Sequence, residues 1–194
     1  VDSMVFFGLQ YYCLRYLIDD WNYNFFMQKT KKVVVEYDNF IEKTLGKDAV
    51  SSDHVKALHQ LGYLPIKIKA LKEGTLVPMR VPCLTIENTH PDFYWLTNFL
   101  ETSLSATLWG MCTSATTSFQ YRKNAEKYAA LTCDDNSHVP FNCHDFSLRG
   151  LFGMEAGAMS GAAHLLNFVG TDTIPAIHFL QHYYGADINK ELVG

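Results

Sequence analysis

The chain has 194 residues, of which 48% are hydrophobic and 19% are charged, and its formal net charge is −4. This length allows one large domain or two small ones, and the composition is that of an ordinary soluble globular protein. The small negative charge and the scattered Lys and Arg residues give no electrostatic case for binding nucleic acid. No apolar run approaches the roughly 18 residues of a transmembrane helix, so we expect no membrane span.

The termini and the cysteines favour a cytoplasmic protein. The first residues, VDSMVFFGLQYY, lack the basic segment that opens a signal peptide. Five cysteines are present, an odd number with no CxxC pair. Reduced thiols in the cytoplasm are the simplest interpretation.

The N-terminal part is predicted to be helical. We expect three helices, over residues 5–18, 24–45 and 53–61. The first should break near Asp19 and Asp20, and the second should stop at Gly46. The third has an N-cap candidate in Ser51–Asp53 and a closing glycine in Gly62.

From Leu64 the hydrophobic period changes to two. A small antiparallel sheet with one solvent-exposed face is expected from strands over residues 64–70, 75–78 and 82–87. After the break at residues 90–92, two more helices are expected, over residues 93–108 and 113–131. The polar loop 132–138 then separates an α+β domain, residues 1–137, from a second part, residues 138–194.

The second part is predicted to begin a parallel β-α-β unit. Its elements are a strand over 141–146, a turn over 147–150, a helix over 152–166 and a strand over 167–169. A stripe of small residues should let this helix pack closely, at Gly153, Gly157 and Gly161. Two parallel strands cannot bury both faces of a sheet, so we expect the chain to be a fragment of a longer protein.

Ligands of parallel α/β structures bind at the carboxyl ends of the strands. The residues expected there are Asp145, Phe146 and Arg149 after the first strand and Asp172 after the second. An aromatic face, a guanidinium and a carboxylate on one rim suit a flat, polar, phosphorylated ligand.

Each of these residues also has a purely structural interpretation. Phe146 could belong to the core, and Arg149 could form an ion pair with Asp145 or Glu155. Asp172 could be the N-cap of the helix that follows it.

Five segments, in order, resemble the nicotinamide phosphoribosyltransferases. They are GLQY (8–11), ENTHPDFYWLTNFLET (87–102), HDFSLRG (144–150), AHLLNFVGTDT (163–173) and YYG (183–185). The resemblance implies an α/β fold of the type II phosphoribosyltransferases, in which an α+β domain packs on an irregular α/β barrel. The predicted β-α-β unit would be the start of that barrel.

The same resemblance implies the reaction and the site. These enzymes join nicotinamide to phosphoribosyl pyrophosphate, giving nicotinamide mononucleotide and pyrophosphate. Phe146 would stack on the pyridine ring, Arg149 would contact the ring and the phosphate, Asp172 would accept a hydrogen bond from the carboxamide, and His144 would line the access channel. Asp172 and Arg149 are the candidate catalytic residues.

The resemblance also implies partners and cofactors. Members act as homodimers with shared active sites and use Mg²⁺, whose ligands we expect outside this chain, with ATP as a further candidate. The missing segments hold half of the site, so the isolated fragment should be inactive. Two alternatives stay open: a nicotinate phosphoribosyltransferase, in which the family pattern lacks an acid at the place of Asp172, and a non-catalytic ligand-binding homologue.

Overall fold

The computed structural model describes residues 2–191 of the chain. Its mixture of helices and short strands confirms the expected α/β class. The chain divides into two compact units: unit 1 takes in Val1–Tyr12, Ala70–Leu84 and Thr102–Gly194, and unit 2 takes in Cys13–Lys69 and Thr85–Glu101. The boundary expected at residues 137 and 138 lies inside unit 1, and it stays a prediction about the domains of the whole protein.

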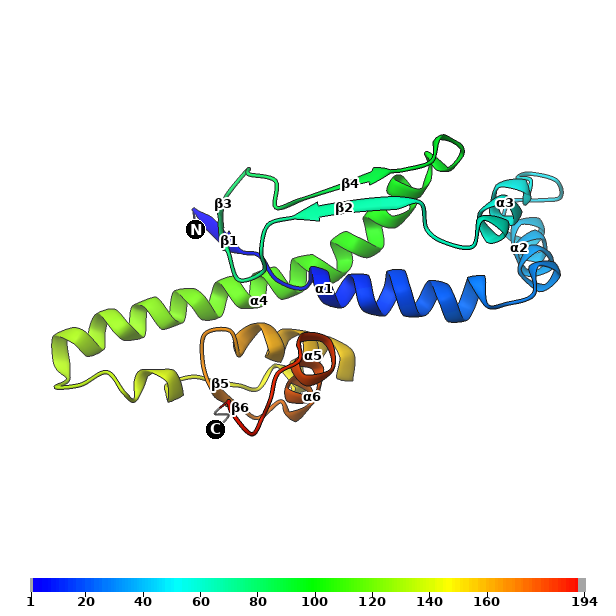
Figure 1. The fold of residues 1–194 in the computed structure, drawn as a ribbon. Coiled ribbons are helices and arrows are strands. Elements are labelled where there is room, and N and C mark those ends of the chain that lie inside the picture. The colour runs from blue at the N-terminus through cyan, green and yellow to red at the C-terminus, as the bar shows by residue number, and fades with distance from the viewer. Residues whose placement is uncertain (1, 192–194) are drawn as a thin grey trace. The chain divides into compact units, whose positions relative to one another are not determined.

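Unit 2 is largely helical (Figure 1). Its helical elements are η1 (Cys13–Asp20) and η2 (Asn22–Phe26), which are π-helical, then α2 (Thr30–Thr44), α3 (Asp53–Leu61) and the 3-10 turn η3 (Pro91–Phe93). Its buried core is formed by Leu58, Phe93 and Leu96, packed against partly buried aromatic residues. Removal of this apolar surface from water is what holds the small helices together.

Local signals predicted part of this unit. Helix α3 has the expected bounds, and it ends at Gly62, whose φ of 83° is left-handed. The helix expected from residue 24 begins only at Thr30, because Lys29 is extended with ψ 130°. The break expected after η1 is wrong, since helical turns continue through Phe26 and Asp20 accepts a hydrogen bond from the Asn24 amide at 2.6 Å.

The strands pair differently from the single sheet that was predicted. The structure has β1 (Ser3–Val5) antiparallel to β3 (Leu76–Pro78), and β2 (Ile66–Ala70) beside β4 (Leu84–Asn88), where the arrows of Figure 1 run in opposite directions. Residues 3–5 are therefore a strand and not the start of a helix, and α1 (Leu9–Tyr12) begins after Gly8. Gly8 has φ 111°, and a Cβ there would lie 2.6 Å from the sulfur of Met111. A glycine is required at this turn.

A single long helix, α4 (Leu96–Thr132), replaces the two helices predicted over 93–108 and 113–131. Gly110 does not interrupt it, although glycine inside a helix is about 1 kcal/mol less favourable than alanine. The helix buries a stripe of residues that includes Leu104, Leu108, Met111 and Ala115. Burial of such side chains contributes about 1.5–3 kcal/mol each, which outweighs the glycine. Among the described residues, neither α4 nor any other helix is both long and apolar enough to cross a membrane.

The predicted parallel β-α-β unit is confirmed, with shorter strands. Its elements are the 3-10 turn η4 (Val139–Phe141), β5 (His144–Asp145), the 3-10 turn η5 (Ser147–Gly150), α5 (Met154–His164), β6 (Gly170–Thr171) and α6 (Ile174–Tyr184). Strands β5 and β6 are parallel. The second strand begins at Gly170 and not at 167, because Asn167 and Phe168 hydrogen-bond back to the carbonyl of His164. Asn167 also donates to Ala115 O and Ser118 Oγ of α4, which ties the end of α5 to that helix.

The carboxylate of Glu73 connects the first segment of unit 1, around Gly8, with its last helix, α6. It accepts hydrogen bonds from the backbone N–H of Gly8 at 2.8 Å and of Gln10 at 2.6 Å, and from the Tyr184 hydroxyl at 2.9 Å. A carboxylate suits this place because it satisfies the free N–H groups at the start of α1. Burial, and next the charge and hydrogen bond of Glu73, raise the pKa of Tyr184. The GLQY and YYG segments thus meet through one side chain.

The raised pKa of Tyr184 predicts a loss of stability at alkaline pH. Tyrosine ionises near pH 10 in an unfolded chain, whereas Tyr184 stays protonated in the folded protein, so the free energy of unfolding should fall as the pH rises above about 10. Tyr184→Phe should lower that free energy by about 1.5–3 kcal/mol at pH 7, the contribution of a hydrogen bond to a charged group.

The measurement is denaturant unfolding of both proteins between pH 7 and pH 11. The difference between them should shrink above about pH 10, because only the wild type carries the perturbed hydroxyl. A difference that is constant over this range would contradict the role given to Tyr184.

Candidate substrate-binding site

The register of β5 and β6 brings the predicted site residues to one edge. His144 lies opposite Gly170, and Asp145 lies opposite Thr171. The N–H of Asp172 then donates to the carbonyl of Asp145 at 3.0 Å, which holds the two strand ends together. Phe146, which follows β5, and Asp172, which follows β6, therefore lie side by side, as expected for a parallel pair of strands.

His144 and Asp172 form the first pair of site residues. The Nδ1 atom of His144 lies 3.5 Å from Oδ2 of Asp172, and both side chains are a little under half exposed. A Cβ on Gly170 would lie 2.5 Å from the His144 ring, so the glycine is what allows the imidazole to cross the neighbouring strand. An imidazole and a carboxylate are thus held at the rim with access to solvent.

Phe146 and Arg149 form the second pair. The guanidinium carbon lies 5.4 Å from the centroid of the Phe146 ring, within the range of a cation–π contact. The 3-10 turn η5 brings them together, because residues three apart, such as Phe146 and Arg149, lie on the same side of such a turn. Phe146 is 53% exposed, so the core interpretation of this residue is wrong for the described chain.

The ion pairs considered for Arg149 are replaced by other contacts. The carboxylate of Asp145 accepts hydrogen bonds from Ser147, at 3.3 Å from N–H and 3.0 Å from the hydroxyl. The carboxylate of Glu155 accepts one from the Tyr11 hydroxyl. Asp145 is 8% exposed and points into the structure, so its carboxylate does not lie at the rim where it was expected.

Asp172 is not the N-cap of α6, so the structural interpretation of this residue as a helix cap is wrong. The helix begins at Ile174, and the residue before it is Thr173. The Asp172 carboxylate instead faces His144. Its charge is available to a ligand at the strand ends.

Helix α5 packs closely against α6, β5 and η5 because of two glycines of the predicted stripe. A Cβ on Gly161 would lie 2.7 Å from Ala176 Cβ and 2.9 Å from Asp145 Oδ2. A Cβ on Gly157 would lie 2.5 Å from Leu148 of η5. Gly153 differs, since it has open space around it and precedes α5 with φ 94°.

His164 supports the site from behind, and the sequence analysis missed it. Its Nε2 lies 3.0 Å from Gly170 O in β6 and 3.2 Å from the O of Cys143, the residue before β5, so it donates to acceptors at both strands. Its ring stacks on Phe168. Burial lowers the pKa of His164, against the opposing charge of Asp145, and the neutral imidazole is favoured. Its position in the last turn of an apolar helix was a signal that could have found it.

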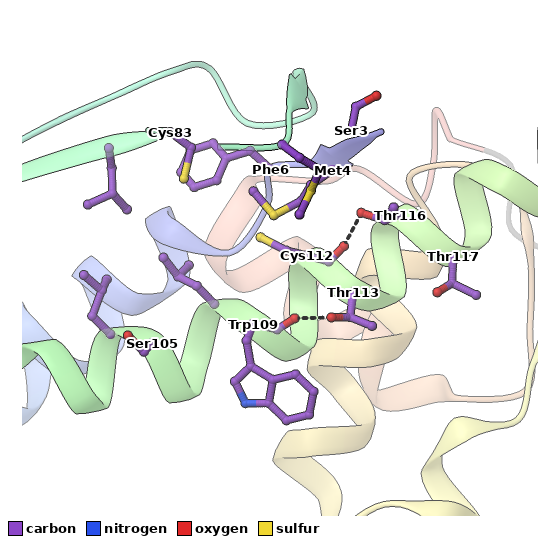
Figure 2. Close-up of a pocket in the computed structure, with 14 residues that line it drawn as sticks. Ser3, Met4, Phe6, Cys83, Ser105, Trp109, Cys112, Thr113, Thr116 and Thr117 are labelled. Atoms are coloured by element: carbon purple, nitrogen blue, oxygen red, sulfur yellow. Dashed lines mark hydrogen bonds between the residues drawn. The ribbon is translucent and has the colours of Figure 1, made fainter. Parts of the chain in front are cut away.

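An apolar cavity of about 630 Å³ lies along α4, and none of the predicted site residues lines it. Figure 2 shows Phe6, Cys83, Cys112 and Trp109 around it. The hydroxyls of Thr113 and Thr116 donate to carbonyls of their own helix, those of Trp109 and Cys112, so they are already satisfied. This lining lacks the charged groups that a phosphorylated substrate needs.

The site residues do not provide a metal centre. Within residues 2–191 there is no group of three or more His, Cys, Asp or Glu side chains placed to share a metal ion. The site edge has one exposed carboxylate, that of Asp172, beside an imidazole. These residues do not fit a Mg²⁺ site, and the expectation that Mg²⁺ is bound by residues outside this chain stays a prediction.

Comparison with known proteins identifies what the chain is similar to. Residues 141–188 match the nicotinate phosphoribosyltransferase (NAPRTase) family. The chain is 48% identical to a nicotinamide phosphoribosyltransferase of Acinetobacter baylyi over 185 residues, which is 95% of this chain and 37% of that protein. It is 40% identical over 124 residues to the enzyme of that name from Xanthomonas campestris, covering 63% of this chain and 26% of that protein. It is 37% identical over 114 residues to the one from Mycoplasma genitalium, covering 57% of this chain and 25% of that protein.

These similarities confirm the resemblance to nicotinamide phosphoribosyltransferases. The matched part of the chain spans 25–37% of the length of these curated relatives. The matched segment 141–188 contains both pairs of site residues and the helices that position them.

The packing of α5 predicts opposite effects for two glycine-to-alanine changes. Gly161→Ala should destabilise the protein by about 1–3 kcal/mol, because the methyl group would overlap Ala176 and Asp145. Gly110→Ala is the control: it lies inside α4 with nothing within 4 Å, so it should stabilise by about 0.5–1 kcal/mol. Thermal or denaturant unfolding measures both. Equal effects of the two changes would contradict the close approach of α5 to the strands.

Proposed function

We propose that this chain is part of a nicotinamide phosphoribosyltransferase, which transfers the phosphoribosyl group of phosphoribosyl pyrophosphate to nicotinamide and releases pyrophosphate. The observation that carries the proposal is the exposed carboxylate of Asp172. Asp172 directly follows β6, and it lies beside the end of β5, after which Phe146 and Arg149 come. An identity of 48% over 95% of this chain to an enzyme of this name supports the proposal.

The chemistry requires positioning more than covalent assistance from the protein. The ring nitrogen of nicotinamide is a weak nucleophile, and it must meet the anomeric carbon as the bond to pyrophosphate breaks and positive charge develops. Holding the two reactants in line supplies much of the rate enhancement, and fixed charges around the leaving group supply more. Mg²⁺ would neutralise the pyrophosphate when it is bound. The residues of this chain hold and orient the substrates.

Phe146 is suited to hold the pyridine ring. Its ring is 53% exposed at a strand end, so about half of its surface can be reached by a ligand. Stacking grips a flat ring without occupying its nitrogen, which must stay free to react. Arg149 lies over the same phenyl ring and carries a permanent positive charge for the phosphate of the second substrate.

Asp172 is suited to distinguish an amide from an acid. Its carboxylate can accept a hydrogen bond from the carboxamide NH₂ of nicotinamide. The carboxylate of nicotinate would instead place a second negative charge a few ångströms away. Two such charges repel by about 4 kcal/mol at 4 Å and an effective dielectric near 20. Screening by solvent reduces this at a half-exposed group, and about 1.4 kcal/mol already gives a tenfold preference.

The rest of the site is proposed to lie outside this chain. We propose that a second copy of the protein completes the slot around the pyridine ring, in a homodimer with shared active sites. Loops beyond this chain would hold the ribose, the pyrophosphate and Mg²⁺, with ATP as a further cofactor. We propose a cytoplasmic location, which fits the reduced thiols that the odd cysteine number and the lack of a CxxC pair suggest.

A nicotinate phosphoribosyltransferase is the second candidate. The description of the family that matches residues 141–188 favours it. The carboxylate of Asp172 argues against it, because a nicotinate site needs a neutral or positive group there. A non-catalytic homologue would keep the slot for nicotinamide without turnover.

Substrate choice is tested by Asp172→Ser in the complete protein. The wild type should use nicotinamide in preference to nicotinate by about tenfold or more. The variant loses a hydrogen bond to a charged group, worth about 1.5–3 kcal/mol, so kcat/KM for nicotinamide should fall by about 10–150-fold. The kcat/KM for nicotinate should hold or rise, because the repulsion is gone.

Steady-state kinetics with both substrates measure this effect. Asp135→Ser is the matched control, since Asp135 lies in the loop after α4 and its carboxylate accepts a hydrogen bond from the N–H of its neighbour Ser137 at 2.6 Å. A wild type that prefers nicotinate would favour the second candidate. A protein that binds nicotinamide and turns over neither substrate would favour the non-catalytic homologue.

Stacking on Phe146 is tested by its truncation. Phe146→Ala should weaken binding of nicotinamide by about 1–3 kcal/mol, through loss of the ring contact and of buried apolar area. Phe146→Tyr, which keeps the ring, should bind nearly as well as the wild type. Calorimetric titration gives the affinities. Because Phe146 is exposed, the melting temperature should change little, and a large loss of thermal stability with unchanged affinity would show that the residue serves packing only.

A further inference from the structure

We propose that Thr173 is the positioning residue that orients Asp172 toward the carboxamide and so sets the preference for amide over acid. This inference rests on the function proposed above and adds a determinant of its specificity. Thr173 itself does not reach the rim, because its side chain is fully buried. It acts through the backbone on which Asp172 stands.

Hydrogen bonds fix the chain on both sides of Asp172. The Thr173 hydroxyl donates to the carbonyl of Asp145 at 3.2 Å, and the N–H of Asp172 donates to the same carbonyl at 3.0 Å. The N–H of Thr173 donates to Oγ1 of Thr171 at 3.0 Å. The residues before and after Asp172 are both buried, while its own carboxylate is exposed. Asp172 is thus an exposed group on an anchored segment.

The Thr173 hydroxyl is not used to start the helix that follows. A threonine before a helix commonly accepts a hydrogen bond from an N–H of the first turn, but Thr173 makes no such side-chain cap on α6. Its hydroxyl turns back to β5 instead. The contact serves the junction of the two strand ends, where the site lies.

The methyl group of Thr173 has a separate role. Its Cγ2 lies 3.2 Å from the place where a Cβ on Gly161 would be, so it packs against α5. The two branches of the side chain therefore separate two functions: the hydroxyl holds β5, and the methyl fills the space under the helix. Substitutions can remove either branch alone.

Recognition of an amide by one carboxylate is sensitive to direction. A hydrogen bond weakens steeply when its angle falls, and functional groups must be held within about 0.5 Å of their productive geometry. Without the hydroxyl of Thr173, the Asp145 carbonyl loses one of the two hydrogen bonds that join it to residues 172 and 173, so the backbone that carries Asp172 is held less firmly. The carboxylate would then lose its alignment with the NH₂ while keeping its charge.

The test compares Thr173→Val and Thr173→Ser in the complete protein, with kcat/KM measured for nicotinamide and for nicotinate. Valine keeps the shape and removes the hydroxyl, so the ratio of the two values should fall by about fivefold or more, the equivalent of one hydrogen bond of about 1 kcal/mol. Serine keeps the hydroxyl, so the ratio should stay close to that of the wild type even if the melting temperature falls. If the valine protein does not fold, Thr173→Ala against Thr173→Ser isolates the hydroxyl in the same way.

A double-mutant cycle adds a readout that a merely structural role would not change. In the Asp172→Ser background, Thr173→Val should leave the substrate ratio unaltered, because there is no carboxylate left to orient. An equal loss for both substrates in Thr173→Val, or an undiminished effect in the Asp172→Ser background, would overturn the inference.

The outcomes separate this inference from the proposed function. A wild type that prefers nicotinamide, with a ratio that Thr173→Val does not change, overturns the inference alone. A wild type that does not prefer nicotinamide overturns the proposed function, and the inference falls with it.

Discussion

The close approach of helix α5 to the β5–β6 strand pair is the constraint on which the candidate site depends. At Gly161 the helix backbone lies so near Ala176 and Asp145 that an alanine methyl would overlap both. Thr173 packs into the same region with its methyl group and reaches β5 with its hydroxyl. Because protein interiors are close-packed, this contact limits how far the ends of β5 and β6 can shift.

Two aspartates in this segment illustrate how burial divides their roles. The carboxylate of Asp145 is buried, and Ser147 satisfies it with two hydrogen bonds, so it shapes the turn η5. The carboxylate of Asp172 is exposed at the rim beside His144, so its charge remains available to a ligand. The backbone of Asp145 supports Asp172, since the carbonyl of Asp145 accepts a hydrogen bond from the N–H of Asp172. Structure and recognition are thus coupled within a few residues.

The sequence predicted those features that local signals determine. Helix α3 had a serine-rich start and the closing glycine Gly62, and the β-α-β unit had strong turn and helix signals around Gly150. The order of Phe146, Arg149 and Asp172 along two strand ends was enough to bring them to one edge, whereas the carboxylate of Asp145, expected there too, is buried.

The features that were missed depend on contacts between distant parts of the chain. Pairing of β1 with β3 joins residues more than 70 positions apart, and no local pattern announces it. The continuity of α4 through Gly110 depends on the stripe that the helix buries, and the role of His164 depends on the carbonyls of both strands. In the first two cases tertiary contacts overrode local propensity.

The most direct test of the account is a crystal structure of the complete protein with nicotinamide bound. In that structure the pyridine ring should stack on Phe146 at about 3.5–4 Å, and the carboxamide nitrogen should lie about 2.7–3.2 Å from an oxygen of Asp172. A nicotinamide bound away from Phe146, or an Asp172 carboxylate that turns to the N-terminus of α6 and leaves the amide unpaired, would contradict the proposed recognition of nicotinamide.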